Sequence, residues 1–130
     1  MPSIGLITRY AAPKGKNVRV DAGVGAGSTI SVFYDPMLAK VITWGEDREE
    51  ARKRMVQALN GYHVEGIFTN IDFANLVLTH PVFIRGELST DFIPTYLLGT
   101  DGPESKPAAE VLHAMAVATT LIYHLRENLV

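Results

Sequence analysis

The chain has 130 residues, 47% of them apolar, and a formal net charge of −2 with its four histidines counted as neutral. This length suits one domain or a part of a larger protein, and the apolar share is enough for a packed core. The weak negative charge gives no general attraction to nucleic acid or to an anionic membrane, so we expect neither partner. The absence of cysteine excludes disulfide scaffolds, thiol catalysis and cysteine-bound zinc.

The amino-terminal residues predict a short strand and no targeting signal. No apolar leader run follows Met1, so we expect no signal peptide and a cytoplasmic location. Residues 3–10 alternate loosely between apolar and polar side chains, which is typical of a strand. Proline and glycine in residues 11–17 then indicate a loop.

Residues 17–21 predict a second short strand. Val18 and Val20 share one face of it, and Arg19 and Asp21 share the other. On composition alone, the two charged side chains would form a solvated strand face. A role for Arg19 in a binding site is the alternative.

A glycine-rich stretch at residues 23–29 invites comparison with a phosphate-binding loop. Such a loop needs a lysine before its Ser or Thr and a helix after it, so that backbone N–H groups face the phosphate. Here the lysine is missing, and residues 30–34 continue as a predicted strand. We therefore expect a glycine turn between two strands.

Residues 34–44 predict a bend followed by a buried strand. Asp35-Pro36 sets the bend, because proline fixes φ and disfavours a helical residue before it. Residues 41–44 are β-branched and aromatic, which suits a half-buried pleated surface. Lys40 lies just before them, and it either enters the core beside a partner or reaches the surface at a strand edge.

Residues 46–62 predict the clearest helix. Asp47 and Glu50 have the spacing of a capping box, and Gly61 ends the segment. The charged side chains from Arg48 to Arg54 are interpreted by default as a solvated face. The apolar stripe consists of Ala51, Met55, Ala58, Leu59 and Tyr62.

The rest of the chain predicts one more strand, a helix and a short turn. Residues 63–68 are expected to form the strand. Residues 71–79 are expected to form the helix, which Asn70 caps and which ends before Pro81. Ser89-Thr90-Asp91 can cap the short turn that contains Phe92 and Ile93.

Residues 97–107 have the composition of a linker, and residues 108–130 predict a C-terminal helix. Charged residues and histidines interrupt the apolar stripe of this helix too often for a membrane span. We expect the stripe to contact the domain itself, a second copy, another subunit or a further domain. Its contact residues are Val111, Met115, Ala118 and Ile122.

No catalytic constellation emerges from residue spacing. His63, His80, His113 and His124 lack the spacing of metal ligands, so we expect no metal site. The expected fold is α+β: a small antiparallel sheet, curled toward a barrel-sandwich, with flanking helices and the C-terminal helix. Residues 1–96 would form the domain.

Seven short motifs occur in one order along residues 2–93. The most specific pair is Tyr34-Asp35-x-Met37-x-x-Lys40 followed by Gly66-Ile67-x-Thr69-Asn70. The others are Pro2-Ser3-x-Gly5, Val18-Arg19-Val20-Asp21, Trp44-Gly45-x-Asp47-Arg48, His80-Pro81-x-Phe83-x-x-Gly86 and Ser89-Thr90-x-Phe92-Ile93. Together they resemble the C-terminal subdomain of biotin carboxylase, found in acetyl-, propionyl- and methylcrotonyl-CoA carboxylases and in pyruvate carboxylase.

The resemblance implies a parent enzyme that uses ATP, Mg²⁺ (or Mn²⁺) and bicarbonate to carboxylate N1 of biotin. The ATP-grasp part lies N-terminal to this subdomain in the family, so we expect this chain to bind none of these cofactors alone and to be inactive alone. The family's subdomain lends one arginine to the biotin site, and by motif this is Arg19. Its fixed positive charge would stabilise negative charge on the ureido oxygen. Glu65 matches an acidic position at the edge of that region.

The resemblance also implies partners. These are the ATP-grasp portion of biotin carboxylase, a biotin carrier domain and a carboxyltransferase subunit. A homodimer contact would run through Trp44 and Arg48. Residues 94–130 resemble the start of the segment that leads to the carrier, but Ala114-Met115-Ala116 lacks the acceptor lysine, so we expect no biotinylation of this chain. In a eukaryote the location would be the mitochondrial matrix.

Two functional interpretations follow. In the first, the chain is part of a ligase of fatty acid metabolism and contributes Arg19 and a packing surface to biotin carboxylation. In the second, the same fold serves only as an oligomerisation or assembly module, with the helix at residues 108–128 as its contact.

Overall fold

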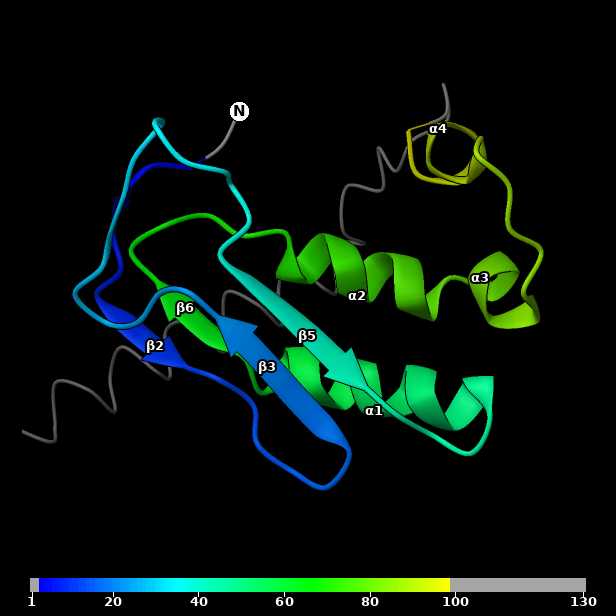
Figure 1. The fold of residues 1–130 in the computed structure, drawn as a ribbon. Coiled ribbons are helices and arrows are strands. Elements are labelled where there is room, and N and C mark those ends of the chain that lie inside the picture. Colours follow the sequence, from blue (N-terminus) through cyan, green and yellow to red (C-terminus); the bar gives the residue numbers. More distant parts are fainter. Residues whose placement is uncertain (1–2, 99–130) are drawn as a thin grey trace, which may run out of the picture. The chain divides into compact units, whose positions relative to one another are not determined.

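The computed structural model describes residues 3–98 (Figure 1). The chain divides into two units, Met1–Glu87 and Leu88–Val130. Within the described residues, the first unit contains the strands and three helices, and the second contains the short helix α4 (Phe92–Tyr96). The predicted helix at 108–130, and nearly all of the predicted linker at 97–107, lie outside the described residues.

Three antiparallel strand pairs make up the β structure of the first unit. They are β1 (Gly5–Leu6) with β4 (Thr29–Ile30), β2 (Arg9–Ala11) with β6 (His63–Glu65), and β3 (Val18–Ala22) with β5 (Ala39–Thr43). The predicted α+β class with antiparallel pairing is confirmed. Each pair is a separate two-stranded ladder, so the described strands do not close into a barrel.

The predicted strand at residues 3–10 is divided between β1 and β2 because the backbone changes partner at Ile7. The Ile7 amide donates to the Ser28 carbonyl at 2.9 Å, and the next amide, from Thr8, donates to the Glu65 carbonyl at 2.9 Å. The Ile7 side chain is fully buried at this crossing, with 0% exposure. One alternating segment therefore supplies strands to two ladders.

The predicted continuation of a strand through residues 30–34 is wrong. β4 ends at Ile30, and the following residues turn. The Ser31 hydroxyl accepts a hydrogen bond from the Phe33 amide, a local contact that competes with a strand ladder. The predicted bend at Asp35 is present, and the Asp35 carboxylate accepts from the Met37 amide at 2.7 Å.

The first helix of this unit packs beside the β3–β5 ladder, the second packs on the first, and the third packs on the second (Figure 1). These are α1 (Arg48–Asn60), α2 (Ile71–Thr79) and α3 (Pro81–Arg85). As predicted, the Asp47 side chain caps α1 by accepting from the Glu50 amide at 2.7 Å, and Gly61 ends the helix. Asn70 precedes α2 as predicted, although its side chain makes no capping hydrogen bond.

The buried core of the first unit is small. It comprises Ile7, Ala58, Leu59, Tyr62 and Val82. Three of these follow the helical stripe predicted for residues 46–62, so the face of α1 that packs on β5 was identified from periodicity. None of the described helices is long and apolar enough to cross a membrane.

Candidate functional site

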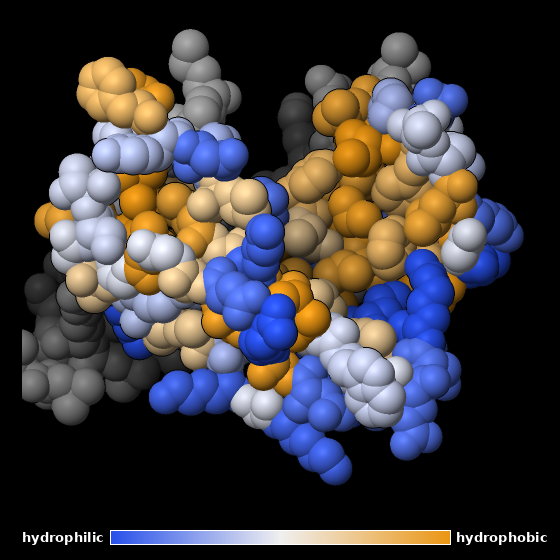
Figure 2. Space-filling model, viewed as in Figure 1, coloured by the Kyte–Doolittle hydropathy of each residue, from blue (hydrophilic) through white to orange (hydrophobic). Residues whose placement is uncertain are grey.

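The β3–β5 ladder presents a charged face in the first unit. Arg19 and Asp21 lie on the exposed side of β3, while Val18 and Val20 lie on the more buried side. The Arg19 Nη2 atom lies 3.0 Å from Asp21 Oδ2, and the two side chains are 72% and 51% exposed. Figure 2 shows hydrophilic side chains over this ladder. The predicted placement of both residues on one strand face is confirmed.

Lys40 joins this face from β5. The strand register pairs Asp21 with Lys40 and Arg19 with Ile42. Lys40 is exposed, so it takes the surface position at the strand rather than a place in the core. Two cations and one carboxylate therefore share one solvent-facing side of a two-stranded ladder, and we call Arg19, Asp21 and Lys40 the charged face.

Glu65 lies on a different ladder. The register of β2 and β6 places it opposite Arg9, and Arg9 Nη1 lies 3.0 Å from Glu65 Oε1. Both side chains are more than half exposed. Arg9 was not singled out from the sequence, because only the pairing of two segments 56 positions apart brings it to Glu65. Among the described residues, no hydrogen bond or ion pair joins Glu65 to Arg19.

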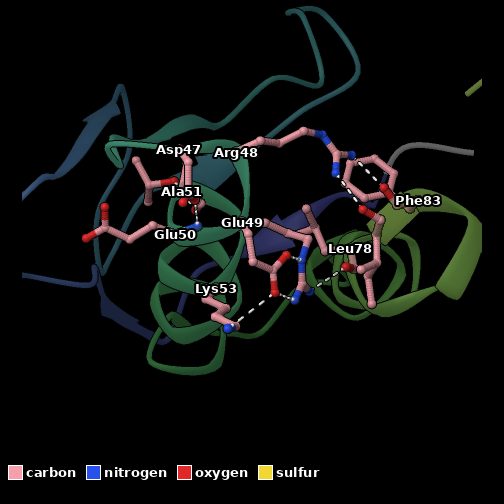
Figure 3. Close-up of polar contacts among 11 residues, drawn as sticks. Asp47, Arg48, Glu49, Glu50, Ala51, Lys53, Leu78 and Phe83 are labelled. Carbon is pink, nitrogen blue, oxygen red and sulfur yellow. Dashed lines mark hydrogen bonds and ion pairs between the residues drawn. The ribbon is translucent and has the colours of Figure 1, made fainter. Parts of the chain in front are cut away.

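Trp44 and Arg48 flank the start of α1. The Trp44 side chain is 59% exposed. The Arg48 guanidinium donates to the carbonyl oxygens of Phe83 at 2.5 Å and Ile84 at 3.0 Å, and it lies 4.9 Å from the centre of the Phe83 ring (Figure 3). Arg48 therefore links α1 to α3 of the same chain through hydrogen bonds. Its predicted role in a dimer contact stays a prediction.

The charged residues of α1 are not only a solvated face. Arg52 binds both carboxylate oxygens of Glu49 and donates to the Leu78 carbonyl of α2 at 2.8 Å. Arg54 donates to the Trp44 carbonyl and lies 2.6 Å from Glu50. The guanidinium of Arg52 is the main cause that lowers the pKa of Glu49 to about 2. Arg52 therefore connects α1 to α2, and Arg54 connects α1 to the segment that precedes it.

A largely apolar groove of about 660 Å³ opens on the first unit. Tyr10 and Tyr62 belong to its lining, and their hydroxyl oxygens lie 2.6 Å apart. Burial is the main cause that raises the pKa of Tyr62. Met37 and Phe68 line it and are 56% and 91% exposed. Exposed apolar surface of this kind marks an interaction site.

The expected helix contacts Val111, Met115, Ala118 and Ile122 lie outside the described residues. Across residues 3–98, no group of three or more His, Asp or Glu side chains is arranged to hold a metal ion.

Comparison with known proteins identifies relatives for most of the chain. The family model described as the biotin carboxylase C-terminal domain matches residues 1–95. Biotin carboxylase 1 of Bacillus subtilis is 47% identical over 96 residues, which cover 74% of this chain and 21% of that protein. The mitochondrial methylcrotonoyl-CoA carboxylase subunit alpha of Dictyostelium discoideum is 35% identical over 129 residues, covering 98% of this chain and 18% of that protein.

Solved structures give the same result. The biotin carboxylase–βγ-ATP complex from Campylobacter jejuni superposes with a TM-score of 0.69 at 34% identity. The match covers 72% of this chain and 21% of that chain. The chain thus spans only about a fifth of the length of such relatives.

Proposed function

Because the chain belongs to the biotin carboxylase C-terminal domain family, we propose that it forms the C-terminal part of the biotin carboxylase component of a biotin-dependent carboxylase. Alone it would be inactive, since it spans about a fifth of the length of its relatives. In the parent ligase it would supply Arg19 to the biotin site and a surface that packs on the ATP-grasp portion.

The single observation that carries the catalytic part of this proposal is the exposure of the Arg19 guanidinium. Its side chain is 72% exposed and contacts Asp21 through one nitrogen. Arginine carries five N–H donors and does not titrate near neutral pH, so the other donors can meet an anionic oxygen. Negative charge collects on the ureido oxygen of biotin when N1 loses its proton, and a fixed guanidinium stabilises it there.

The cofactors are assigned to the parent enzyme. Biotin, when bound, supplies the ureido nitrogen that takes up the carboxyl group. Arg19 fits this group by charge and donor geometry. ATP, Mg²⁺ (or Mn²⁺) and bicarbonate would be held chiefly by the ATP-grasp portion, as the family resemblance implies.

The apolar groove supports the packing part of the proposal. Phe68 and Met37 line it, and Phe33, in the turn after β4, is 87% exposed. Monomeric proteins rarely leave several large apolar side chains so open to water. The ATP-grasp portion would cover this surface. Glu65 would shape the rim of the biotin site, and Trp44 with Arg48 would contact a second copy of the parent enzyme.

The further partners are a biotin carrier domain and a carboxyltransferase subunit, and the cytoplasm is the proposed location. Relatives whose names state a mitochondrial location include the human propionyl-CoA carboxylase alpha chain, which is 45% identical over 94 residues. In a eukaryote the matrix would therefore be the location. A place in fatty acid metabolism follows if the parent acts on an acyl-CoA.

A chimera tests the proposal. Residues 1–95 would replace the matching residues of Biotin carboxylase 1 from Bacillus subtilis, and carboxylation of free biotin would be measured with ATP and bicarbonate. We expect an active chimera and a loss of about a hundredfold or more in Arg19→Ala, as for removal of one oxyanion-stabilising donor. Arg85→Ala, which removes an exposed arginine of α3, is the control and should keep the activity.

Equal activities for the unsubstituted chimera and Arg19→Ala would reject the catalytic role. The oligomerisation or assembly module would then be the better interpretation. For that role, sedimentation of the full chain should reveal an assembly that Met115→Glu or Ile122→Glu dissociates.

A further inference from the structure

We propose that Asn60 is a modification site, at which the side-chain amide is converted spontaneously to a carboxylate, and that its contact with Asn75 controls the rate. The inference does not depend on the proposed function. It is carried by two observations: Asn60 is followed directly by Gly61, and its Oδ1 atom accepts a hydrogen bond of 3.0 Å from Asn75 Nδ2.

The residue after Asn60 makes it the most reactive asparagine of the chain. Loss of the amide begins when the next backbone nitrogen attacks the side-chain carbonyl carbon, and a side chain on the next residue hinders this attack. Glycine has no side chain and allows the widest range of backbone angles. The other four asparagines of the chain precede valine, isoleucine or leucine. Asn60 is also exposed, so water reaches it.

The reaction consumes water and involves no change of oxidation state. The Gly61 amide gives its proton to solvent, its nitrogen bonds to Asn60 Cγ, and the Cγ–Nδ2 bond breaks as ammonia leaves with a proton from water. The product is a cyclic imide. Addition of water to either of its carbonyl carbons reopens the ring, and the residue becomes aspartate or isoaspartate, in which the main chain runs through Cβ and Cγ.

The fold opposes the first step at both reacting atoms. Asn60 is the last residue of α1, and side chains of a helix point back toward its N-terminus, away from the next amide. The Gly61 amide donates to the carbonyl oxygens of Gln57 and Ala58 at 3.2 Å, so its nitrogen is not free to attack. The reaction therefore requires local opening of the last turn of α1, a motion that helix ends undergo readily.

Asn75 restrains the Asn60 side chain from α2. Its Nδ2 group donates to Asn60 Oδ1, and this contact ties the end of α1 to the middle of α2. The other polar atom of the same amide, Asn75 Oδ1, is buried and has no hydrogen-bond partner within the described residues. An unpaired buried oxygen costs free energy, so folding stability alone does not explain an asparagine here. Restraint of Asn60 gives this amide a role.

The products would disturb the connection between α1 and β6. α1 has no basic residue in its last turn, so a carboxylate there meets the negative end of the helix without compensation. Isoaspartate also lengthens the main chain just before Tyr62, a buried residue whose amide donates to the Leu59 carbonyl at 3.1 Å. Conversion should therefore loosen a residue that lines the apolar groove.

Ageing of the full chain at mildly alkaline pH tests the proposal. Mass spectrometry of the peptide that contains residue 60 would follow the replacement of NH₂ by OH, and its isoaspartate content would be measured. We expect conversion to be at least about fivefold slower in the folded chain than in the same chain in denaturant. Asn75→Ala should raise the rate in the folded chain about twofold to tenfold, as loss of one hydrogen bond predicts.

Two further variants serve as controls. Asn70→Ala also removes an asparagine side chain at α2, but one that makes no capping hydrogen bond, so the rate at Asn60 should not change. Gly61→Ala should slow conversion in the folded and the unfolded chain alike. It should fold, because φ is −91° and a Cβ there would lie 3.7 Å from its nearest atoms. Thermal unfolding of each variant would measure its stability.

Each part of the proposal has its own contrary outcome. Absence of conversion at Asn60 in the unfolded chain would reject the site, and equal rates with and without denaturant would reject protection by the fold. An unchanged rate in Asn75→Ala, or an equal acceleration in Asn70→Ala, would reject the restraint by Asn75. Biotin carboxylation enters none of these measurements, so this proposal and the proposed function fail separately.

Discussion

The Arg52 guanidinium donates two hydrogen bonds of 2.7 Å to the Glu49 carboxylate, one from Nε and one from Nη2. Its third nitrogen reaches the Leu78 carbonyl near the end of α2. The Arg52 side chain is only 11% exposed. Arg52 therefore forms an ion pair within α1 and also connects α1 to α2.

Replacing Arg52 should therefore destabilise the first unit. In Arg52→Ala the Leu78 carbonyl and Glu49 lose a charged partner, and we expect the free energy of unfolding to fall by about 1–3 kcal/mol. Denaturant titration of the chain measures this. Lys53→Ala is the control, since Lys53 contacts the same carboxylate at 3.4 Å but is 66% exposed, and it should cost at most about 0.5 kcal/mol. Equal effects of the two variants would contradict the linking role.

Stability should fall in acid, partly through Glu49. Hydrogen bonding to Arg52 is the largest cause that lowers its pKa from the ordinary 4.5 to about 2. A carboxyl whose pKa is lower in the folded state stabilises above its unfolded pKa, and this stabilisation is lost as pH falls from about 4.5 toward 2.

The variant Glu49→Gln should reduce the slope of stability against pH within that window. It should not remove the slope, because the pKa values of Glu50 and Glu87 are lowered too, chiefly by a backbone hydrogen bond from Glu46 and a side-chain hydrogen bond from Arg85. Thermal unfolding between pH 2 and pH 7 would provide the measurement. An unchanged slope in Glu49→Gln would show that Glu49 does not contribute.

Replacing Arg48 tests whether this side chain stabilises the folded chain itself or a contact between two copies of it. Arg48→Ala removes two hydrogen bonds to carbonyls of α3 and a contact with the Phe83 ring, so we expect a loss of about 1 kcal/mol at an exposed site. The loss should be the same at low and high protein concentration. A dimer contact would instead make the stability of the unsubstituted chain rise with concentration, and Arg48→Ala would abolish that rise.

Gly66 should not tolerate a side chain. Its φ is +99°, and a Cβ there would collide with the Leu6 carbonyl oxygen. We expect Gly66→Ala to cost more than about 2 kcal/mol, since strain and overlap act together. Gly86→Ala is the matched control: φ is +79°, but the space is open, so the cost should stay near 1–2 kcal/mol for the backbone alone. Similar melting temperatures for both would exclude the collision.

Much of the local structure was predictable because its causes are local. The apolar stripe that ends in Ala58, Leu59 and Tyr62 defined the buried face of α1 through helical periodicity. Asp47 and Gly61 marked the ends of that helix through capping chemistry. The alternation in β3 placed Arg19 and Asp21 on one exposed face.

Other features depend on which segments meet, and a pattern within one segment does not contain that information. The division of residues 3–10 between two ladders follows from the change of backbone partner at Ile7, and the pairing of Arg9 with Glu65 follows from the register of β2 and β6. In the same way, the hydrogen bond from Arg52 to the Leu78 carbonyl depends on the packing of α2 against α1.

By itself, then, the sequence determined the class of fold, the faces of its main elements and the motifs that it shares with its family. Only the tertiary structure decided which charged groups are partners, that Lys40 lies at the surface opposite Asp21, and that Arg48 and Arg52 bind backbone carbonyls of other helices. The physical reason is that periodicity and capping act within a few residues, whereas ion pairs and hydrogen bonds between elements need two distant segments to be brought within about 3 Å.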